Sequence, residues 1–185
     1  MKGVEGDLAF NPHAVPGLTL NLAGALNSAK YASSFLGACY NGQTIAEGCG
    51  PGNLQQFDGR PLPRAPHFSG SGGFTYEAAL SSDYKAVLNA NGVYTSRHYL
   101  SQELTPVGVA GRRVLVDSSI SVGPKSGLFE VALIGRNLTN KYYPLSGFQT
   151  PGTGSGTGTN VGVLSDFEGP ISRGREIWLK LTVRP

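Results

Sequence analysis

Seven segments of the chain alternate apolar and polar residues with a period of two, which is typical of a β-strand that presents two different faces. The clearest is 18–31, where Leu18, Leu20 and Leu22 alternate with Thr19 and Asn21. The other segments are 3–10, 67–79, 84–99, 112–123, 128–143 and 174–184. A tilted strand crosses a membrane with about 9–11 residues, and most of these segments reach that length. We therefore predict an all-β fold, an antiparallel up-and-down meander of about seven strands.

The connections between these segments alternate in length. Residues 11–17, 80–83 and 124–127 form short turns, whereas three long loops remain, at 32–66, 100–111 and 144–173. In an antiparallel meander all short turns then lie at one end of the sheet and all long loops at the other. Transmembrane barrels of the bacterial outer membrane have this asymmetry, with short periplasmic turns and long outer loops. Within the last loop, the Gly/Thr tract 150–162 predicts a mobile tip.

Composition narrows the classes of protein. Only 15% of the residues are charged, and the 27 glycines and 12 prolines disfavour helices, so the composition suits a sheet whose outside is not wholly in water. No run of 18 apolar residues predicts a membrane-spanning helix. The net charge of +3 is small, and the basic residues form no stripe with interleaved aromatic residues. We therefore expect no nucleic-acid partner.

The two cysteines, Cys39 and Cys49, lie in the segment CYNGQTIAEGC. This short span, rich in Gly and Asn, can close a disulfide, which would stabilise the fold by about 2–3 kcal/mol and would imply an oxidising compartment. The alternative is a pair of free thiols in an unstructured loop. A metal site would need more ligands, and the loop contains no histidine.

Several of these segments together resemble a known family. The segment GRNLTNKYY at 135–143, followed by a long loop and RGREIWLKLTVRP at 173–185, resembles the C-terminal end of a TonB-dependent receptor. Residues 3–31 resemble a strand, periplasmic turn and strand of that family's barrel. CYNGQTIAEGC followed by GRPLPRAPHF at 59–68 resembles one of its cysteine-containing outer loops.

The resemblance implies that residues 1–185 are a partial barrel domain, the C-terminal segment of a barrel of about 22 strands in the Gram-negative outer membrane. Such receptors take up scarce solutes such as siderophores, with energy that the TonB complex passes to an N-terminal plug domain. The implied partners are outer-membrane lipid, the upstream strands and plug, TonB through that plug, and an imported small molecule. The resemblance implies no cofactor.

The chain departs from the family pattern in three ways. It shows no signal peptide, and it shows neither a plug domain nor a box that docks TonB. It also ends in Pro185, where the family usually has an aromatic residue. We therefore interpret it as the last third of a receptor barrel or as a truncated reading frame from one.

The strand phase assigns residues to the two faces. Val131 and Leu133 are expected to face lipid, and Tyr142 and Tyr143 to lie in an aromatic belt at the outer interface. Trp178 falls on the polar phase of the last segment. The side chains expected to line the barrel interior, and to contact a ligand there, are Asn89, Asn91, Arg97, Asp117, Arg136 and Lys180.

The arginines of this set allow two interpretations. Arg97 and Arg136 lie near the outer ends of their strands, where an anionic ligand could first be held. The alternative is that they pair with acids across the barrel wall or with the plug.

Sequence patterns of catalysis are missing. His13, His67 and His98 are far apart and have no ligand-spaced neighbours, and no nucleophile elbow or phosphate-binding loop is present. We expect neither an enzyme nor a resident metal. Two other folds are alternatives to the receptor barrel. A secreted β-sandwich binding module with one disulfide predicts polar outer faces and similar loops at both ends. A complete eight-stranded outer-membrane barrel needs one more strand and a signal peptide, and neither is visible in the sequence.

Overall fold

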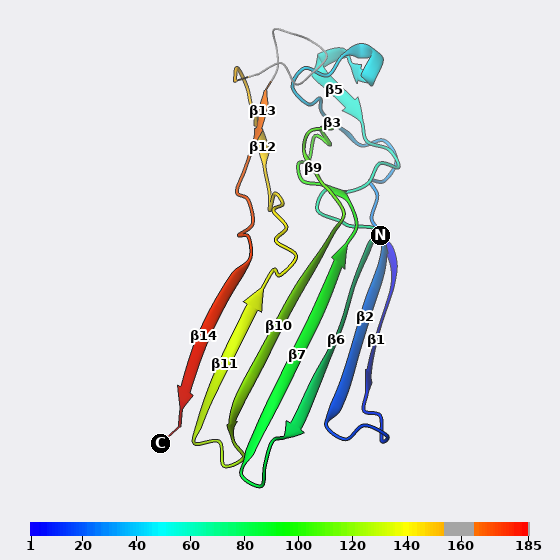
Figure 1. The fold of residues 1–185 in the computed structure, drawn as a ribbon. Coiled ribbons are helices and arrows are strands. Elements are labelled where there is room, and N and C mark those ends of the chain that lie inside the picture. Colours follow the sequence, from blue (N-terminus) through cyan, green and yellow to red (C-terminus); the bar gives the residue numbers. More distant parts are fainter. Residues whose placement is uncertain (154–164, 185) are drawn as a thin grey trace.

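The computed structural model describes residues 1–153 and 165–184 and contains one large antiparallel sheet of seven strands (Figure 1). Its strand order is β1-β2-β6-β7-β10-β11-β14, so each of these strands lies beside the one of the seven that comes next along the chain. The seven strands are β1 (Lys2–Phe10), β2 (Leu18–Ser28), β6 (Phe68–Ala79), β7 (Tyr84–Thr95), β10 (Arg113–Pro124), β11 (Phe129–Arg136) and β14 (Glu176–Val183). The predicted all-β meander is confirmed. Pro185 and most of the Gly/Thr tract lie outside the described residues.

Three of the predicted strands end several residues earlier than their alternation suggested: the segment 18–31 ends at Ser28, and the other two are 84–99 and 128–143. The segment 84–99 divides into β7 and a short strand β8 (His98–Tyr99), which pairs with β9 (Val109–Ala110). The segment 128–143 ends at Arg136 because Asn137 adopts a φ of +47°, a left-handed conformation that turns the chain out of the sheet.

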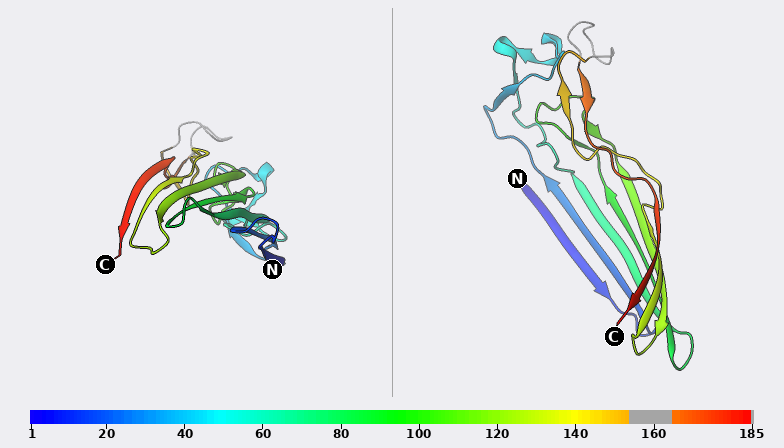
Figure 2. Two further views of the ribbon diagram at one scale, coloured as in Figure 1. Left: turned by 60° about the horizontal axis from the view of Figure 1, so that its bottom comes forward. Right: turned by 90° about the vertical axis from the view of Figure 1, so that its left-hand side faces the viewer.

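The register gives the sheet one continuous apolar face. Phe10 lies beside Leu20, Leu20 beside Phe74, and Phe74 beside Ala90. A neighbouring row, nearer the short turns, runs through Leu18, Tyr76, Leu88, Ile120, Leu133 and Leu179. These side chains meet no second layer, and Leu179 is 77% exposed. The sheet is curved, and no other sheet covers it in the described part of the chain (Figure 2). A β-sandwich would need such a cover, so this arrangement speaks against it.

Ser118 is a polar residue on the apolar face, and its environment explains why it is tolerated. It lies beside Ala90 and Gly135 in the register. Its hydroxyl donates to the backbone carbonyl of Asn89 at 2.8 Å, so the polar group is satisfied within the sheet.

The buried core lies in the long loops and not in the large sheet. Among the buried apolar residues only Ala132 belongs to the sheet, whereas Phe57, Leu100 and Leu104 belong to the loops. The loops gather at one end of the sheet (Figures 1 and 2). Besides β8 and β9 they contain β3 (Leu36–Ala38), η1 (Ile45–Glu47), β4 (Cys49–Gly50), η2 (Pro51–Asn53), β5 (Leu54–Gln56), β12 (Phe148–Thr150) and β13 (Asp166–Glu168).

A disulfide and an aromatic cluster stabilise the first long loop. Cys39 and Cys49 are bonded, with Cα atoms 5.7 Å apart, which confirms the predicted disulfide. The ring centroid of Tyr31 lies 4.9 Å from that of Phe35 and 4.9 Å from that of Phe57. Burial in this cluster, and secondarily the charge of Glu103, raises the pKa of Tyr31 above its ordinary value of 10.0.

Gln55 joins the first long loop to the second. Its side chain is 1% exposed, and its Nε2 donates to the carbonyl oxygens of Ala38 at 2.8 Å and Glu103 at 2.9 Å. Its Oε1 accepts from the Arg60 guanidinium at 2.6 Å and from Gln43 Nε2 at 3.2 Å. The amide nitrogen and the amide oxygen of Gln55 therefore both have hydrogen-bond partners, as burial of a polar side chain requires.

The third long loop joins the same core. Asn41 donates from its backbone N–H to Gln149 Oε1 at 2.9 Å, and from its side-chain amide to the hydroxyl of Ser165. The Phe167 ring lies so close to Gly108 that a Cβ there would meet it at 2.6 Å. The three long loops thus form one packed unit, the loop core. Among the described residues no helix is long and apolar enough to cross a membrane.

We predict that Gln55→Ala loosens the loop core. The substitution leaves the carbonyls of Ala38 and Glu103 without their donor, at about 1–3 kcal/mol, so amide exchange in the first two long loops should quicken by about ten- to a hundredfold. Hydrogen–deuterium exchange measures this. The exposed neighbour Gln56→Ala is the matched control and should change little. Equal exchange in both variants would contradict the role given to Gln55.

Candidate ligand-contact surface on the polar face

The opposite face of the sheet carries two rows of polar side chains. In the first row Asn21, Gly73, Asn91 and Asp117 lie side by side across β2, β6, β7 and β10. In the second, Thr19, Thr75, Asn89, Ser119, Ile134 and Trp178 follow one another from β2 to β14. Trp178 therefore lies on the polar face, as its phase predicted.

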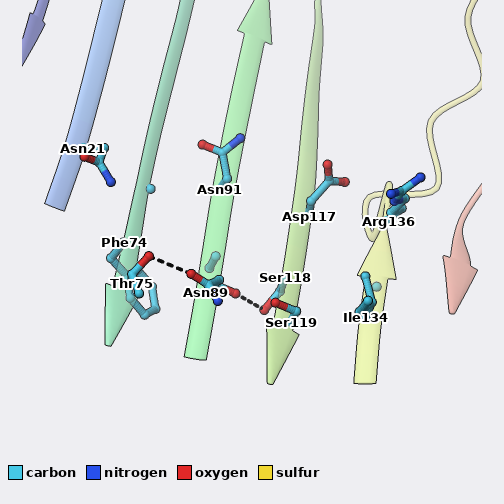
Figure 3. Close-up of a pocket in the computed structure, with 13 residues that line it drawn as sticks. Asn21, Phe74, Thr75, Asn89, Asn91, Asp117, Ser118, Ser119, Ile134 and Arg136 are labelled. Atoms are coloured by element: carbon cyan, nitrogen blue, oxygen red, sulfur yellow. Dashed lines mark hydrogen bonds between the residues drawn. The ribbon is translucent and has the colours of Figure 1, made fainter. Parts of the chain in front are cut away.

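The two rows form a hollow of about 240 Å³ (Figure 3). Asn91, Asp117 and Arg136 lie along its side nearer the long loops, with Thr75, Asn89 and Ser119 on the other. The side chains come from five different strands, so the ladder of the sheet fixes their spacing. The hollow is open, and its few polar groups lie among apolar residues such as Phe74 and Ile134, so they can orient a bound molecule through hydrogen bonds.

Gly73 shapes the floor of this hollow. A Cβ at Gly73 would lie 2.6 Å from the carbonyl oxygen of Ala90 and 3.0 Å from Oδ1 of Asn91. The missing side chain therefore lets Asn91 lie across β6, and any larger residue would displace it.

Hydrogen bonds orient the polar groups in the hollow. Thr75 donates its hydroxyl to Asn89 Oδ1 at 2.6 Å, which leaves the Asn89 amide nitrogen as a donor for a bound molecule (Figure 3). Asp117 Oδ1 accepts from the backbone N–H of Asn137 at 2.7 Å. The Arg136 guanidinium makes no ion pair with any residue in the described part of the chain. The surface thus offers amide donors, one carboxylate and one unpaired cation.

The structure brings together four of the six predicted interior residues. Asn89, Asn91, Asp117 and Arg136 line the one hollow. Lys180 lies on the same face nearer the short turns, opposite Ala132, and Arg97 follows the end of β7 at the base of the loop core. The prediction missed Asn21, Thr75 and Ser119, although the same period of two in 18–31, 67–79 and 112–123 could have found them.

The segment GRNLTNKYY has a structural role beside this surface. Asn137 Nδ2 donates to the carbonyls of Lys141 at 2.8 Å and Arg173 at 3.0 Å. Its Oδ1 accepts from the N–H of Lys141 at 3.0 Å and the hydroxyl of Thr139 at 3.2 Å. Asn137 therefore fastens the chain leaving β11 to the chain that enters β14.

Tyr143 contacts an arginine at the long-loop end of the sheet, and its place in an aromatic belt stays a prediction. Its ring lies 4.2 Å from the Arg113 guanidinium. Arg113 lies opposite Thr95 in the register of β10 and β7, and its side chain is on the same face as that of Asp117. The contact with Tyr143 therefore lies on the polar side of the sheet. The tyrosine supplies a cation–π contact to an arginine whose buried Nη1 has no hydrogen-bond partner.

Candidate metal ligands do not gather on this surface in the part of the chain that the structure describes. In residues 1–153 and 165–184, no three His, Cys, Asp or Glu side chains gather to hold a metal ion. The second tyrosine with a raised pKa, Tyr40, lies in the loop core, where burial and then the charge of Glu47 favour its neutral form.

A curved up-and-down sheet with one apolar face, one polar face and every long loop at one end has the architecture of a segment of a transmembrane β-barrel. Two solved structures share it. One is the ferric yersiniabactin uptake receptor FyuA from Yersinia pestis, with a TM-score of 0.66 and 12% identity over 98% of this chain and 23% of the receptor. The other is BauA, the ferric preacinetobactin receptor from Acinetobacter baumannii, with a TM-score of 0.55 and 16% identity over 97% of this chain and 21% of the receptor.

The chain thus spans less than a quarter of either receptor. At these identities the likeness shows the fold, which is that of a segment of a TonB-dependent receptor barrel, as the sequence resemblance implied. No family model and no curated protein matches the sequence.

We predict that Asn137→Ala frees the turn after β11. Alanine loses the four side-chain hydrogen bonds and is strained at a φ of +47° by about 1–2 kcal/mol. Asn137→Gly loses the same bonds without the strain, so its effect should be smaller. Amide exchange at Leu138 and Arg175 reports both variants, because these N–H groups bond to Val116 and Asn140. Unchanged exchange in the glycine variant would show that the side-chain bonds contribute nothing.

Proposed function

We propose that this chain is the C-terminal barrel segment of an outer-membrane receptor that takes up a scarce solute, such as a ferric siderophore, in a Gram-negative bacterium. One observation carries the proposal: a largely apolar, exposed face lies opposite a polar face that contains a hollow. Lipid covers the first face in this proposal, and the solute's path runs along the second.

Backbone hydrogen bonding supports a larger barrel around this segment. β1 and β14 are the edges of the sheet, and each has a partner strand on one side only in the described part of the chain. Unpaired amides cost several kcal/mol each in lipid, so further strands must close the sheet. β1 and β14 run in the same direction, because six antiparallel steps separate them. Antiparallel closure then requires an odd number of added strands, and a barrel of about 22 strands supplies about 15.

The polar face supports a role in solute contact. Arg136 is an unpaired cation in the hollow, and Arg97 lies farther along the path at the base of the loop core. An anionic ferric complex would meet these two cations in turn. In the proposed receptor the remaining polar rows face a plug domain, which couples the barrel to the TonB complex. No chemical step is assigned to the chain.

Single cysteines on β7 test the membrane setting. Leu88 and Ala90 lie on the apolar face, and Asn89 and Asn91 lie on the polar face. The native cysteines are bonded to each other, so each introduced thiol is the reactive one. In membranes a water-soluble maleimide should modify the cysteines at 89 and 91 and spare those at 88 and 90. Val107→Cys in a long loop is the accessible control. Equal labelling on both faces would reject the barrel.

Matched cation variants test solute contact. Arg136→Gln should weaken binding of net-negative ferric siderophores by about tenfold, the magnitude of one charge-assisted hydrogen bond. Lys180→Gln removes the same charge from the same face outside the hollow and should have little effect. Binding is measured by quenching of intrinsic fluorescence in the whole encoded protein. Equal losses in both variants would show that the hollow has no special role.

A further inference from the structure

The charged residues of the seven long strands are divided between the two faces. Every carboxylate in these strands lies on the polar face by its register. They are Glu5, Asp7, Glu77, Asp117, Glu130 and Glu176. The apolar face therefore carries no negative charge within the strands.

Basic residues that share the phase of the apolar face lie only at one margin of the sheet, the end that carries the long loops. Lys2 precedes Val4 by two residues, Arg112 precedes Val114 and Arg175 precedes Ile177, so each shares the phase of an exposed apolar residue. Lys30 lies two residues beyond Ser28, which pairs with Lys2. We call Lys2, Lys30, Arg112 and Arg175 the rim belt; all four are exposed. Four basic residues that are far apart in the sequence thus lie at the same end of the apolar face.

The rim belt has no protein counter-ions. In residues 1–153 and 165–184 the ion pairs are Lys85–Glu77 and Arg173–Glu176, and neither contains a belt residue. The opposite margin differs, because its turns contain one acid, Asp83, beside one base, Lys125. The two turns are adjacent, since the backbone N–H of Lys125 donates to the backbone carbonyl of Asp83 at 2.7 Å. The positive charge is therefore confined to one end of the apolar face.

An aromatic pair places the rim belt relative to the apolar band. Phe68 and Tyr94 lie on the apolar face near the long-loop end, with ring centroids 5.7 Å apart. Phe68 lies beside Leu26 and, through it, beside Val4, one pleat inside Lys2. Aromatic rings of membrane proteins lie at the headgroup level, and long cationic side chains just outside them extend into the headgroups.

We propose that the rim belt binds the phosphate groups of anionic lipid headgroups in the leaflet on the long-loop side. This inference rests on the proposed membrane barrel and names its lipid partner. Ammonium and guanidinium groups donate charge-assisted hydrogen bonds to phosphate oxygens. The four cations lie at the ends of β1, β2, β10 and β14 and are spread along the margin. This spacing suits a surface of headgroups and does not suit one soluble anion.

The experiment measures lipid selectivity of the whole encoded protein in phosphatidylcholine vesicles. Electron spin resonance compares the association of spin-labelled phosphatidylglycerol with that of spin-labelled phosphatidylcholine. The wild-type protein should prefer the anionic lipid by about fivefold or more, given the attraction between surface cations and anionic leaflets. Substitution of all four belt residues (Lys2→Gln, Lys30→Gln, Arg112→Gln, Arg175→Gln) should abolish that preference.

The control removes four cations elsewhere, through Lys85→Gln, Lys125→Gln, Lys180→Gln and Arg184→Gln, and should keep the preference. A belt variant that inserts and still prefers phosphatidylglycerol would overturn the rim belt and leave the proposed receptor intact. Equal losses in belt and control variants would also overturn it, since only net charge would then matter. Protease protection of the strands reports insertion separately, and wild-type protein that fails to insert would overturn both proposals.

Discussion

The hydrogen-bonded ladder between antiparallel strands is the constraint on which the remaining structure depends. It gives each of the five inner strands a partner on both sides, and it sends successive side chains to opposite faces. The leucines spaced by two in β2 therefore lie on the same face of the sheet as those of β11 and β14, although they are far apart in the chain. The same ladder sets Asn21, Asn91 and Asp117 beside one another. One register thus produces both the apolar face and the polar hollow.

Local pattern was sufficient to predict the seven strands and four of the residues in the hollow, because a period of two determines the face of each residue. It was insufficient where nonlocal contacts decide. The end of β11 depends on the left-handed Asn137 and its bonds to Arg173, which no alternation encodes. The contact between the Tyr143 ring and the guanidinium of Arg113, 30 positions earlier, is likewise not encoded by local alternation.

The long loops show the same limit more strongly. The alternation of loop lengths predicted where these loops lie, but it did not predict that they contain most of the buried apolar side chains. Gln55 is polar and stands in no periodic pattern, so its burial could not be predicted from local sequence. Its bonds to Ala38 and Glu103 depend on two loops meeting. The disulfide was predictable because its two cysteines lie in one short loop.

The loop core also bears on the order of folding. The two strands of each short-turn hairpin follow closely in sequence, so their contacts have low contact order and we expect them to form early. The loop core joins Gln55 to Glu103, 48 positions away, and Asn41 to Ser165, 124 positions away, so we expect its contacts to form after those of the hairpins. A slip of one residue in any of these strands would reverse its faces and shift the loops it carries. The contacts of the loop core therefore depend on the strands having paired in the observed register.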